Sequence, residues 1–236
     1  MSLEEFRSEV RDRKRFQFGR NWKRFLTNLN EERIKEAECS LKSMLEVKNL
    51  TGKTFLDVGS GSGLFSLAAK NLGADVVSFD YDEASVWCTS ELKNRYYKRD
   101  GTWKVMQGSI LDIKFLETLG KFDYVYSWGV LHHTGEMWRA LDNVVRLVQP
   151  NGSLFIALYN HQQFVSQYWT FVKRTYNKFP ISRPLWIFLH FLYPTLPSIT
   201  LKYLQSTKLP RGMAVWYDLL DWLGGYPFEV STPREV

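Results

Sequence analysis

The feature that most constrains this chain is a glycine-rich loop that follows an apolar segment. The apolar run Thr54–Val58 leads into the loop, and a stretch with helical periodicity over residues 62–71 follows it. The loop begins at Asp57 and contains Gly59, Gly61 and Gly63. Glycine lets a backbone turn sharply, and it lets a ligand approach where a Cβ would collide. This order of elements is typical of a ligand-binding turn between a strand and a helix in an α/β fold.

The spacing of the glycines distinguishes between classes of ligand. The dinucleotide fingerprint Gly-x-Gly-x-x-Gly would need glycine at position 64, which is Leu64. No Gly-Lys-Ser/Thr sequence ends the loop, so a nucleoside triphosphate is also disfavoured. A second predicted strand ends in Asp80, which lies 17 residues beyond Gly63 (80 − 63). A carboxylate at that position can accept hydrogen bonds from both hydroxyl groups of a ribose.

Short apolar runs alternate with longer amphipathic stretches from Thr54 onward. The runs predict strands at residues 54–58, 75–79, 103–107, 122–127 and 153–158. The stretches 62–71, 83–98 and 136–148 predict helices, with a short helical turn near 113–119. This alternation predicts a doubly wound, mostly parallel α/β sheet with helices on both faces.

The composition of the chain changes on both sides of this alternating region. We expect an N-terminal helical lid or cap over residues 1–50, with helices at 3–15 and 30–46. The core would occupy residues 51–160, and a helical, aromatic-rich segment for acceptor binding or for an interface would occupy 161–236. Ser231 or Thr232 with Pro233 looks like the start of a helix. We therefore favour the interpretation that the final strands of the sheet lie beyond the chain, over a five-stranded sheet or strands supplied by the insertion.

The pattern acid-x-Gly-x-Gly-x-Gly, together with Asp80, resembles the class I S-adenosylmethionine-dependent methyltransferases over residues 50–160. The resemblance implies S-adenosylmethionine as cofactor and S-adenosylhomocysteine as product. It also implies that Asp57 supports the methionine ammonium group, and that the segment at Ser109 and Ile110 flanks the adenine. Many relatives have Asp where this chain has Ser109. The predicted cofactor-binding residues are Asp57, Gly59, Ser60, Gly61, Gly63, Asp80, Tyr81, Ser109, Ile110 and Trp128.

Two adjacent histidines follow the predicted fourth strand, where a doubly wound sheet binds its ligands. If the acceptor atom is a hydroxyl, a base must remove its proton, and histidine suits that role. His132 and His133 are the candidates, and we favour His133. The alternative is that either histidine packs on the cofactor or caps the next helix. A similar Leu-His-His sequence occurs in relatives that have no assigned catalytic histidine.

Tyr159, Asn160 and His161 end the predicted fifth strand and are expected at the entrance for the acceptor. They are not the Asn/Asp-Pro-Pro-Tyr signature of many N-methyltransferases, and no suitable cysteine motif supports C5 methylation of cytosine. The aromatic residues Phe16, Phe18, Trp22 and Phe25 would form either a lid that contributes Trp22 to the acceptor site or a helix packed on the sheet. The arrangement resembles the ubiquinone-biosynthesis O-methyltransferases, which implies a small aromatic, apolar or lipid-linked acceptor.

The distribution of charge keeps other functions open. The formal net charge is +6, and the surplus of Lys and Arg lies in the two flanks of a nearly neutral core. Basic flanks suit an anionic partner, so an RNA or protein methyltransferase is the alternative, with a non-catalytic S-adenosylmethionine-binding module as the third. The aromatic C-terminal segment would suit a homodimer equally well. We find no metal-ligand spacing, signal peptide or membrane-spanning run, and we expect a cytoplasmic protein.

Overall fold

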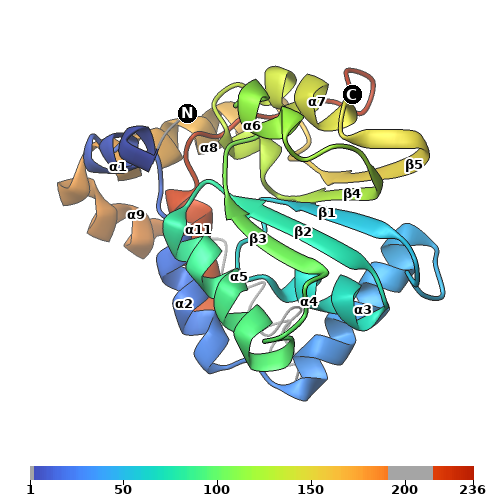
Figure 1. The fold of residues 1–236 in the computed structure, drawn as a ribbon. Coiled ribbons are helices and arrows are strands. Elements are labelled where there is room, and N and C mark those ends of the chain that lie inside the picture. The colour runs from blue at the N-terminus through green and yellow to red at the C-terminus, as the bar shows by residue number, and fades with distance from the viewer. Residues whose placement is uncertain (1–2, 191–214) are drawn as a thin grey trace.

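The computed structural model describes residues 3–190 and 215–236. Its centre is a sheet of five parallel strands in the order β3-β2-β1-β4-β5, as Figure 1 shows. The strands are β1 (Thr54–Val58), β2 (Asp75–Asp80), β3 (Trp103–Gln107), β4 (Phe122–Trp128) and β5 (Val148–Ala157). The order reverses between β1 and β4, which places the switch point of a doubly wound sheet at their carboxyl ends. The predicted fold class is confirmed.

Helices cover both faces of the sheet, and each face buries its own apolar cluster. One cluster joins the sheet to α2 (Gly19–Thr27), α3 (Glu31–Leu45), α4 (Leu64–Asn71) and α5 (Glu83–Tyr96). The other joins the opposite face to α6 (Ile113–Glu117) and α7 (Met137–Val145). The strands that pack between the two layers consist mainly of apolar residues, as strands buried on both faces do.

The strand and helix boundaries lie close to those predicted, except at the start of β5. The predicted strand begins at Ser153, whereas β5 begins at Val148. Its pairing with β4 shifts between the pairs Phe122↔Val148 and Tyr124↔Ser153, so a bulge lies at this point of the sheet. The bulge contains Pro150, Asn151 and Gly152, which are residues that predict a turn, so the first part of the strand was missed.

The N-terminal region folds as α1 (Leu3–Arg11), α2 and α3, and α3 begins with an Asn30 cap that accepts from the Arg33 amide at 3.0 Å. The helix expected over residues 3–15 ends at Arg11. The aromatic segment between the two predicted helices forms α2 and packs on α5, where a Cβ on Gly19 would lie 2.6 Å from Ala84 Cβ.

The C-terminal region consists of helices at one side of the sheet. They are α8 (Gln163–Lys178), the 3₁₀ turn η2 (Pro180–Ser182), α9 (Arg183–His190) and α11 (Val215–Gly224). A small apolar cluster of Val172, Tyr176, Leu219 and Leu223 joins α8 to α11. The apolar segment Pro184–Pro194 continues past α9 and lies partly outside the described residues. In these two ranges, the helices are too short or too polar for any of them to cross a membrane.

Ser231 does not cap a helix; residues 233–235 form a turn, and the amide and hydroxyl of Thr232 donate to the Glu235 carboxylate at 2.7 and 2.8 Å. Ser231 instead forms a parallel bridge with Asn160, and its amide donates to the Tyr159 carbonyl oxygen at 3.0 Å. Ser231 therefore belongs to the backbone pairing beside the end of β5 and not to a helix.

We predict that Gly63→Ala destabilises the protein more than Gly52→Ala does. Both residues have positive φ, +80° and +71°, and this conformation costs an alanine about 1–2 kcal/mol. At Gly63 a Cβ would also lie 2.7 Å from Thr89 Cα, whereas at Gly52 it would meet open space. We expect a loss of about 1 kcal/mol at Gly52 and about 2–4 kcal/mol at Gly63, measured by urea denaturation. Equal losses would contradict this account of the loop.

Candidate functional site

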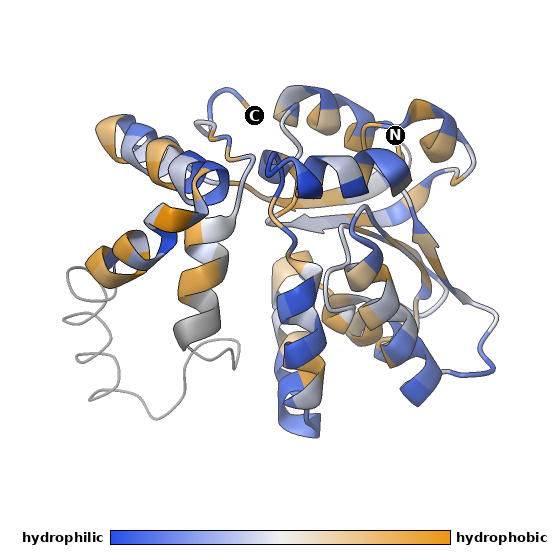
Figure 2. Cartoon of the chain, turned by 90° about the vertical axis from the view of Figure 1, so that its left-hand side faces the viewer, coloured by the Kyte–Doolittle hydropathy of each residue, from blue (hydrophilic) through white to orange (hydrophobic). Residues whose placement is uncertain are grey.

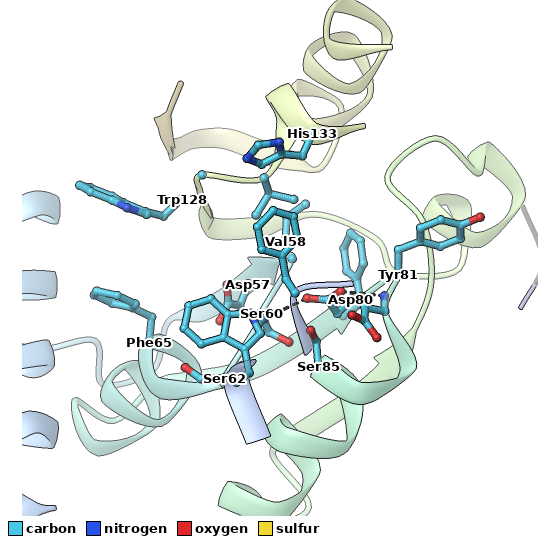
Figure 3. Close-up of a pocket in the computed structure, with 18 of the residues that line it drawn as sticks. Asp57, Val58, Ser60, Ser62, Phe65, Asp80, Tyr81, Ser85, Trp128 and His133 are labelled. Carbon is cyan, nitrogen blue, oxygen red and sulfur yellow. Dashed lines mark hydrogen bonds between the residues drawn. The ribbon is translucent and has the colours of Figure 1, made fainter. Parts of the chain in front are cut away.

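A cavity of about 730 Å³ lies at the carboxyl ends of β1, β2 and β4. This volume falls within the usual range of ligand pockets. Figure 3 shows its floor, with Asp57, Ser60 and Asp80 at the centre, Tyr81 at one end, and Phe65 and Trp128 at the other. Of the predicted residues, those that line it are Trp22, Asp57, Gly59, Ser60, Gly61, Asp80, Tyr81, Ser109, Ile110, Trp128, His133 and Tyr159.

The three loop glycines all have positive φ, but neighbouring protein atoms explain their lack of side chains. A Cβ on Gly59 would lie 2.4 Å from a Val130 methyl group. On Gly61 it would lie 3.1 Å from the Trp22 indole nitrogen, and on Gly63 it would meet Thr89. Gly63 caps α4 and does not line the cavity. The glycines therefore let three parts of the chain close around the loop, besides giving a ligand access to its backbone.

Asp80 has the hydrogen bonds expected of a ribose-binding carboxylate. One oxygen accepts from the Gly61 amide at 2.9 Å, and the other accepts from the Asp82 amide at 2.8 Å. Each oxygen keeps a second lone pair for a hydroxyl donor. Burial raises the pKa of Asp80 to about 7. The residues present thus fit the two-point contact with the sugar of S-adenosylmethionine.

Asp57 lies buried beneath the loop and accepts from the Ser66 hydroxyl at 2.5 Å. Burial raises the pKa of Asp57 to about 6, although the hydrogen bonds from Ser66 act in the opposite direction. A buried carboxylate next to the cavity suits a cationic group, which fits the expected ammonium of the methionine portion. A bound cation would lower its pKa.

The two ends of the cavity differ in chemistry. At one end Ile110 is buried and Tyr81 lies edge-on to Phe6, which leaves flat apolar surface beside Asp80. The Ser109 hydroxyl accepts from the Leu111 amide at 3.1 Å and so stabilises the turn after β3. At the other end Trp128 stacks on Phe155 with ring centroids 5.8 Å apart. Figure 3 places Trp128 at the end of the cavity opposite Tyr81, so a contact of Trp128 with an adenine beside Asp80 is not supported by this arrangement.

The two histidines have different positions in the turn η1 (Leu131–His133). His133 lines the cavity, and its Nδ1 lies 2.6 Å from the Pro227 carbonyl oxygen. Because a carbonyl only accepts, Nδ1 carries the proton and Nε2 keeps its lone pair. His132 is buried outside the cavity lining, with its ring 4.1 Å from that of Tyr159. Burial lowers the pKa of His133 to about 3 and that of His132 to about 2, so both rings are neutral.

The segment between α1 and α2 forms a cover over the cavity. Arg15 donates to the carbonyl oxygens of His133 and Thr134 at 2.7 and 3.1 Å, and it pairs with Glu9 at 2.6 Å. Its guanidinium also lies 5.1 Å from the Tyr81 ring centroid. Phe18 packs against His133, and Trp22 lies on the glycine loop. The predicted aromatic segment thus contacts both halves of the site.

Of the three residues expected at the acceptor entrance, only Tyr159 lines the cavity. Asn160 and His161 are exposed, and both pair with Ser231 through backbone groups. The strand β5 ends at Ala157, and Asn160 and His161 do not line the cavity. Their assignment to the acceptor site is not supported by the geometry.

Sequence reasoning missed several residues that line the cavity. Arg15 lies in a run of mixed charge, and Trp222 lies in the aromatic C-terminal segment, far from the core motifs in the sequence. Phe65 stands in the first turn of α4 and has the appearance of an ordinary core residue. Phe65 could have been found from the sequence, because it lies close to the glycine loop in the chain. Arg15 and Trp222 reach the cavity only through tertiary contacts.

Comparison with known families identifies the segment that builds this site. Residues 56–156 match the family described as "Methyltransferase domain". A ubiquinone biosynthesis O-methyltransferase of Pseudomonas paraeruginosa is 31% identical over 116 residues, which cover 49% of this chain and 48% of that protein. A ribosomal protein L11 methyltransferase of Helicobacter hepaticus is 41% identical over 69 residues, which cover 29% of this chain and 21% of that protein. The chain spans about half the length, or less, of these curated relatives.

Among solved structures, the magnesium protoporphyrin IX methyltransferase of Synechocystis with bound S-adenosylhomocysteine is 19% identical. It has a TM-score of 0.47 and covers 57% of this chain and 59% of that chain. The family match shows a methyltransferase domain over residues 56–156, and the carboxylate of Asp80 beside its glycine loop fits S-adenosylmethionine. The predicted cofactor class is thereby confirmed.

We predict that the affinity for S-adenosylmethionine falls as the pH is lowered from 8 to 6. Asp80 has its pKa raised to about 7, so it is ionised above this value and protonated below it. Only the ionised form can accept from both ribose hydroxyls in addition to its two amide donors. We expect about tenfold weaker binding at pH 6 than at pH 8 by calorimetry. The variant Asp80→Asn should bind weakly at both pH values; equal wild-type affinity at both would contradict the role of Asp80.

Proposed function

We propose that this protein transfers the methyl group of S-adenosylmethionine to a hydroxyl of a small acceptor with an aromatic, apolar or lipid-linked body. The observation that carries the proposal is the placement of His133. It lines the same cavity as the glycine loop, it is neutral, and its tautomer leaves a proton-accepting nitrogen. A neutral base that is fixed beside the cofactor loop suits an acceptor that must lose a proton.

The acceptor class is inferred from the end of the cavity that lies opposite Tyr81. Its walls include Trp22, Phe25, Phe65, Trp128 and Tyr159. These rings come from α2, α4, β4 and the segment after β5, so they surround the space from several sides. Flat aromatic walls favour ring systems and apolar chains over extended polar substrates.

Methyl transfer requires an acceptor atom in line with the bond that breaks. The bound S-adenosylmethionine supplies a methyl carbon that is electrophilic because it is attached to a sulfonium. The cavity walls align the acceptor oxygen with that carbon, which accounts for much of the rate in such reactions. His133 Nε2 accepts the hydroxyl proton as the oxygen–carbon bond forms, while its Nδ1–H keeps the bond to Pro227.

The charge balance of this step explains how a buried histidine can act as the base. Burial lowers the pKa of His133 to about 3, because protonation from solvent adds a charge to a buried site. During transfer the histidine gains one positive charge while the sulfonium loses one. The net charge of the cavity therefore stays constant, and burial opposes this proton transfer much less than protonation from solvent.

The acceptor class is tested by incubating the protein with S-adenosylmethionine labelled in its methyl group and a fractionated cell extract. We expect label in low-molecular-mass or lipid-extractable material, and the labelled species can then be identified by mass spectrometry. Asp80→Ala serves as the control that should not label. Label in RNA or protein would overturn the acceptor class, whereas absence of label with intact cofactor binding would support the non-catalytic alternative.

The role of His133 is tested by His133→Ala. We expect turnover to fall by about 10²–10⁴-fold, because a positioned base contributes about this much. The affinity for S-adenosylmethionine, measured by calorimetry, should stay within about twofold of the wild type. His161→Ala is the matched control, because His161 is exposed and outside the cavity, and it should remain fully active. Full activity of His133→Ala would exclude the base.

A further inference from the structure

The helices α8 and α9 and the turn between them expose an unusual amount of apolar surface. The Phe164 side chain is 81% exposed and Ile181 is 93% exposed. Other large apolar residues at least 43% exposed in this region are Val165, Tyr168, Phe171, Phe179, Leu185, Phe188 and Leu189. Figure 2 shows orange and blue segments alternating along the helices at the left of the view. We call the exposed residues of 164–189 the α8–α9 face. Single exposed apolar residues are ordinary, but a contiguous group indicates an interaction site.

The order of residues along α8 separates buried from exposed positions. Apolar residues recur at helical spacing from Phe164 to Tyr176, but of these only Val172 and Tyr176 are buried against α11. Phe164, Tyr168 and Phe171 follow at spacings of four and three residues, so they occupy one exposed face. That face is apolar although its residues do not take part in the apolar cluster between α8 and α11.

Basic side chains occupy the same face. Arg174 follows Phe171 by three residues and precedes Lys178 by four, so both flank the aromatic stripe on the solvent side of α8. In the part of the chain that the structure describes, neither residue has a carboxylate within ion-pair distance. Residues 161–217 of the sequence contain no Asp or Glu at all. The face is thus both apolar and purely cationic.

We propose that the α8–α9 face docks this protein onto an anionic lipid bilayer surface. A helix lying in the membrane interface buries its aromatic and aliphatic side chains among the acyl chains, while Lys and Arg contact the phosphate groups. Each basic residue near such a surface adds attraction, and no acidic residue here opposes it. The surface suits peripheral association, because its apolar residues lie on the outside of short helices.

The mixture of residues favours a bilayer over the other partners. If two copies paired symmetrically through this face, Arg174 and Lys178 of one copy would lie close to the same cations of the other, without carboxylates to compensate. Nucleic acid would use the cations and could stack on the aromatic rings, but it offers nothing to Ile181 or Leu185. Acyl chains and anionic head groups together satisfy both kinds of side chain.

The same helix connects the docking face to the cavity. On the opposite side of α8, Lys173 is fully buried and donates to the Trp222 carbonyl oxygen. Its ammonium also lies 4.4 Å from the Trp222 ring centroid. Trp222 in turn lines the cavity. Docking through α8 would therefore place one wall of the cavity a single helix away from the bilayer.

The proposal is tested with the purified protein and vesicles of phosphatidylcholine, with or without about one third phosphatidylglycerol, in a flotation assay. We expect binding to the anionic vesicles and at least tenfold less to the neutral ones. The variant with Phe164→Asp and Ile181→Asp should lose at least tenfold in affinity. The variant with Arg174→Glu and Lys178→Glu should lose about 25-fold or more, at roughly fivefold for each charge lost.

The matched control is the variant with Val145→Ser and Arg146→Glu, which changes an exposed apolar residue at the end of α7 and the exposed cation that follows it. It should bind like the wild type. The six positions changed in these three variants are all exposed, so circular dichroism is expected to show unchanged folding. Failure of the wild type to bind anionic vesicles, or equal binding by the α8–α9 variants, would overturn the proposal. A dimer seen by light scattering that dissociates with Ile181→Asp would also overturn it, in favour of a contact between copies.

Discussion

The carboxylate of Asp80 is the group on which the rest of the site depends. It holds the Gly61 amide on one side and the Asp82 amide on the other. The carboxylate of Asp82 then accepts from the Gly19 amide of α2 at 2.8 Å. A line of carboxylate–amide bonds thus runs from the loop after β1, through the turn after β2, to the N-terminal cover. Bonds of this kind are stronger than neutral ones, and here they fix three segments that are distant in sequence.

The core of the fold could be predicted because its signals are local. Apolar runs of five or six residues, a glycine turn and amphipathic stretches specify β1, α4 and β2 within a few residues. The start of β5 could not be predicted, because proline and glycine, here Pro150 and Gly152, occur both in turns between strands and in bulges within a strand. The difference is made by pairing with β4, which no local pattern encodes. The same limit applies to Ser231, whose partner is Asn160.

The end of the cavity that contains Asp57 and Asp80 could be predicted better than the end with the aromatic walls, because only the first depends on local sequence signals. Asp57 and Asp80 lie in the last two residues of the adjacent parallel strands β1 and β2, so their proximity follows from the topology alone. The walls of the other half come from α2, α11 and the segment after β5, which meet only through tertiary packing. Alternation along β5 does not extend past its end at Ala157, and so Tyr159 faces the cavity while Asn160 and His161 do not.

Arg15 connects the segment before α2 to the turn that contains His133. Its two donors hold the carbonyl groups of His133 and Thr134, the turn that carries the proposed base. Any opening of the cover that admits or releases a ligand must break these bonds and free that turn. If His133 is the base, as proposed, its position would then depend on the hydrogen bonds from Arg15. Release of S-adenosylhomocysteine and positioning of the proposed base would then not occur at the same time, because the hydrogen bonds of Arg15 that position the base would be broken during ligand exchange.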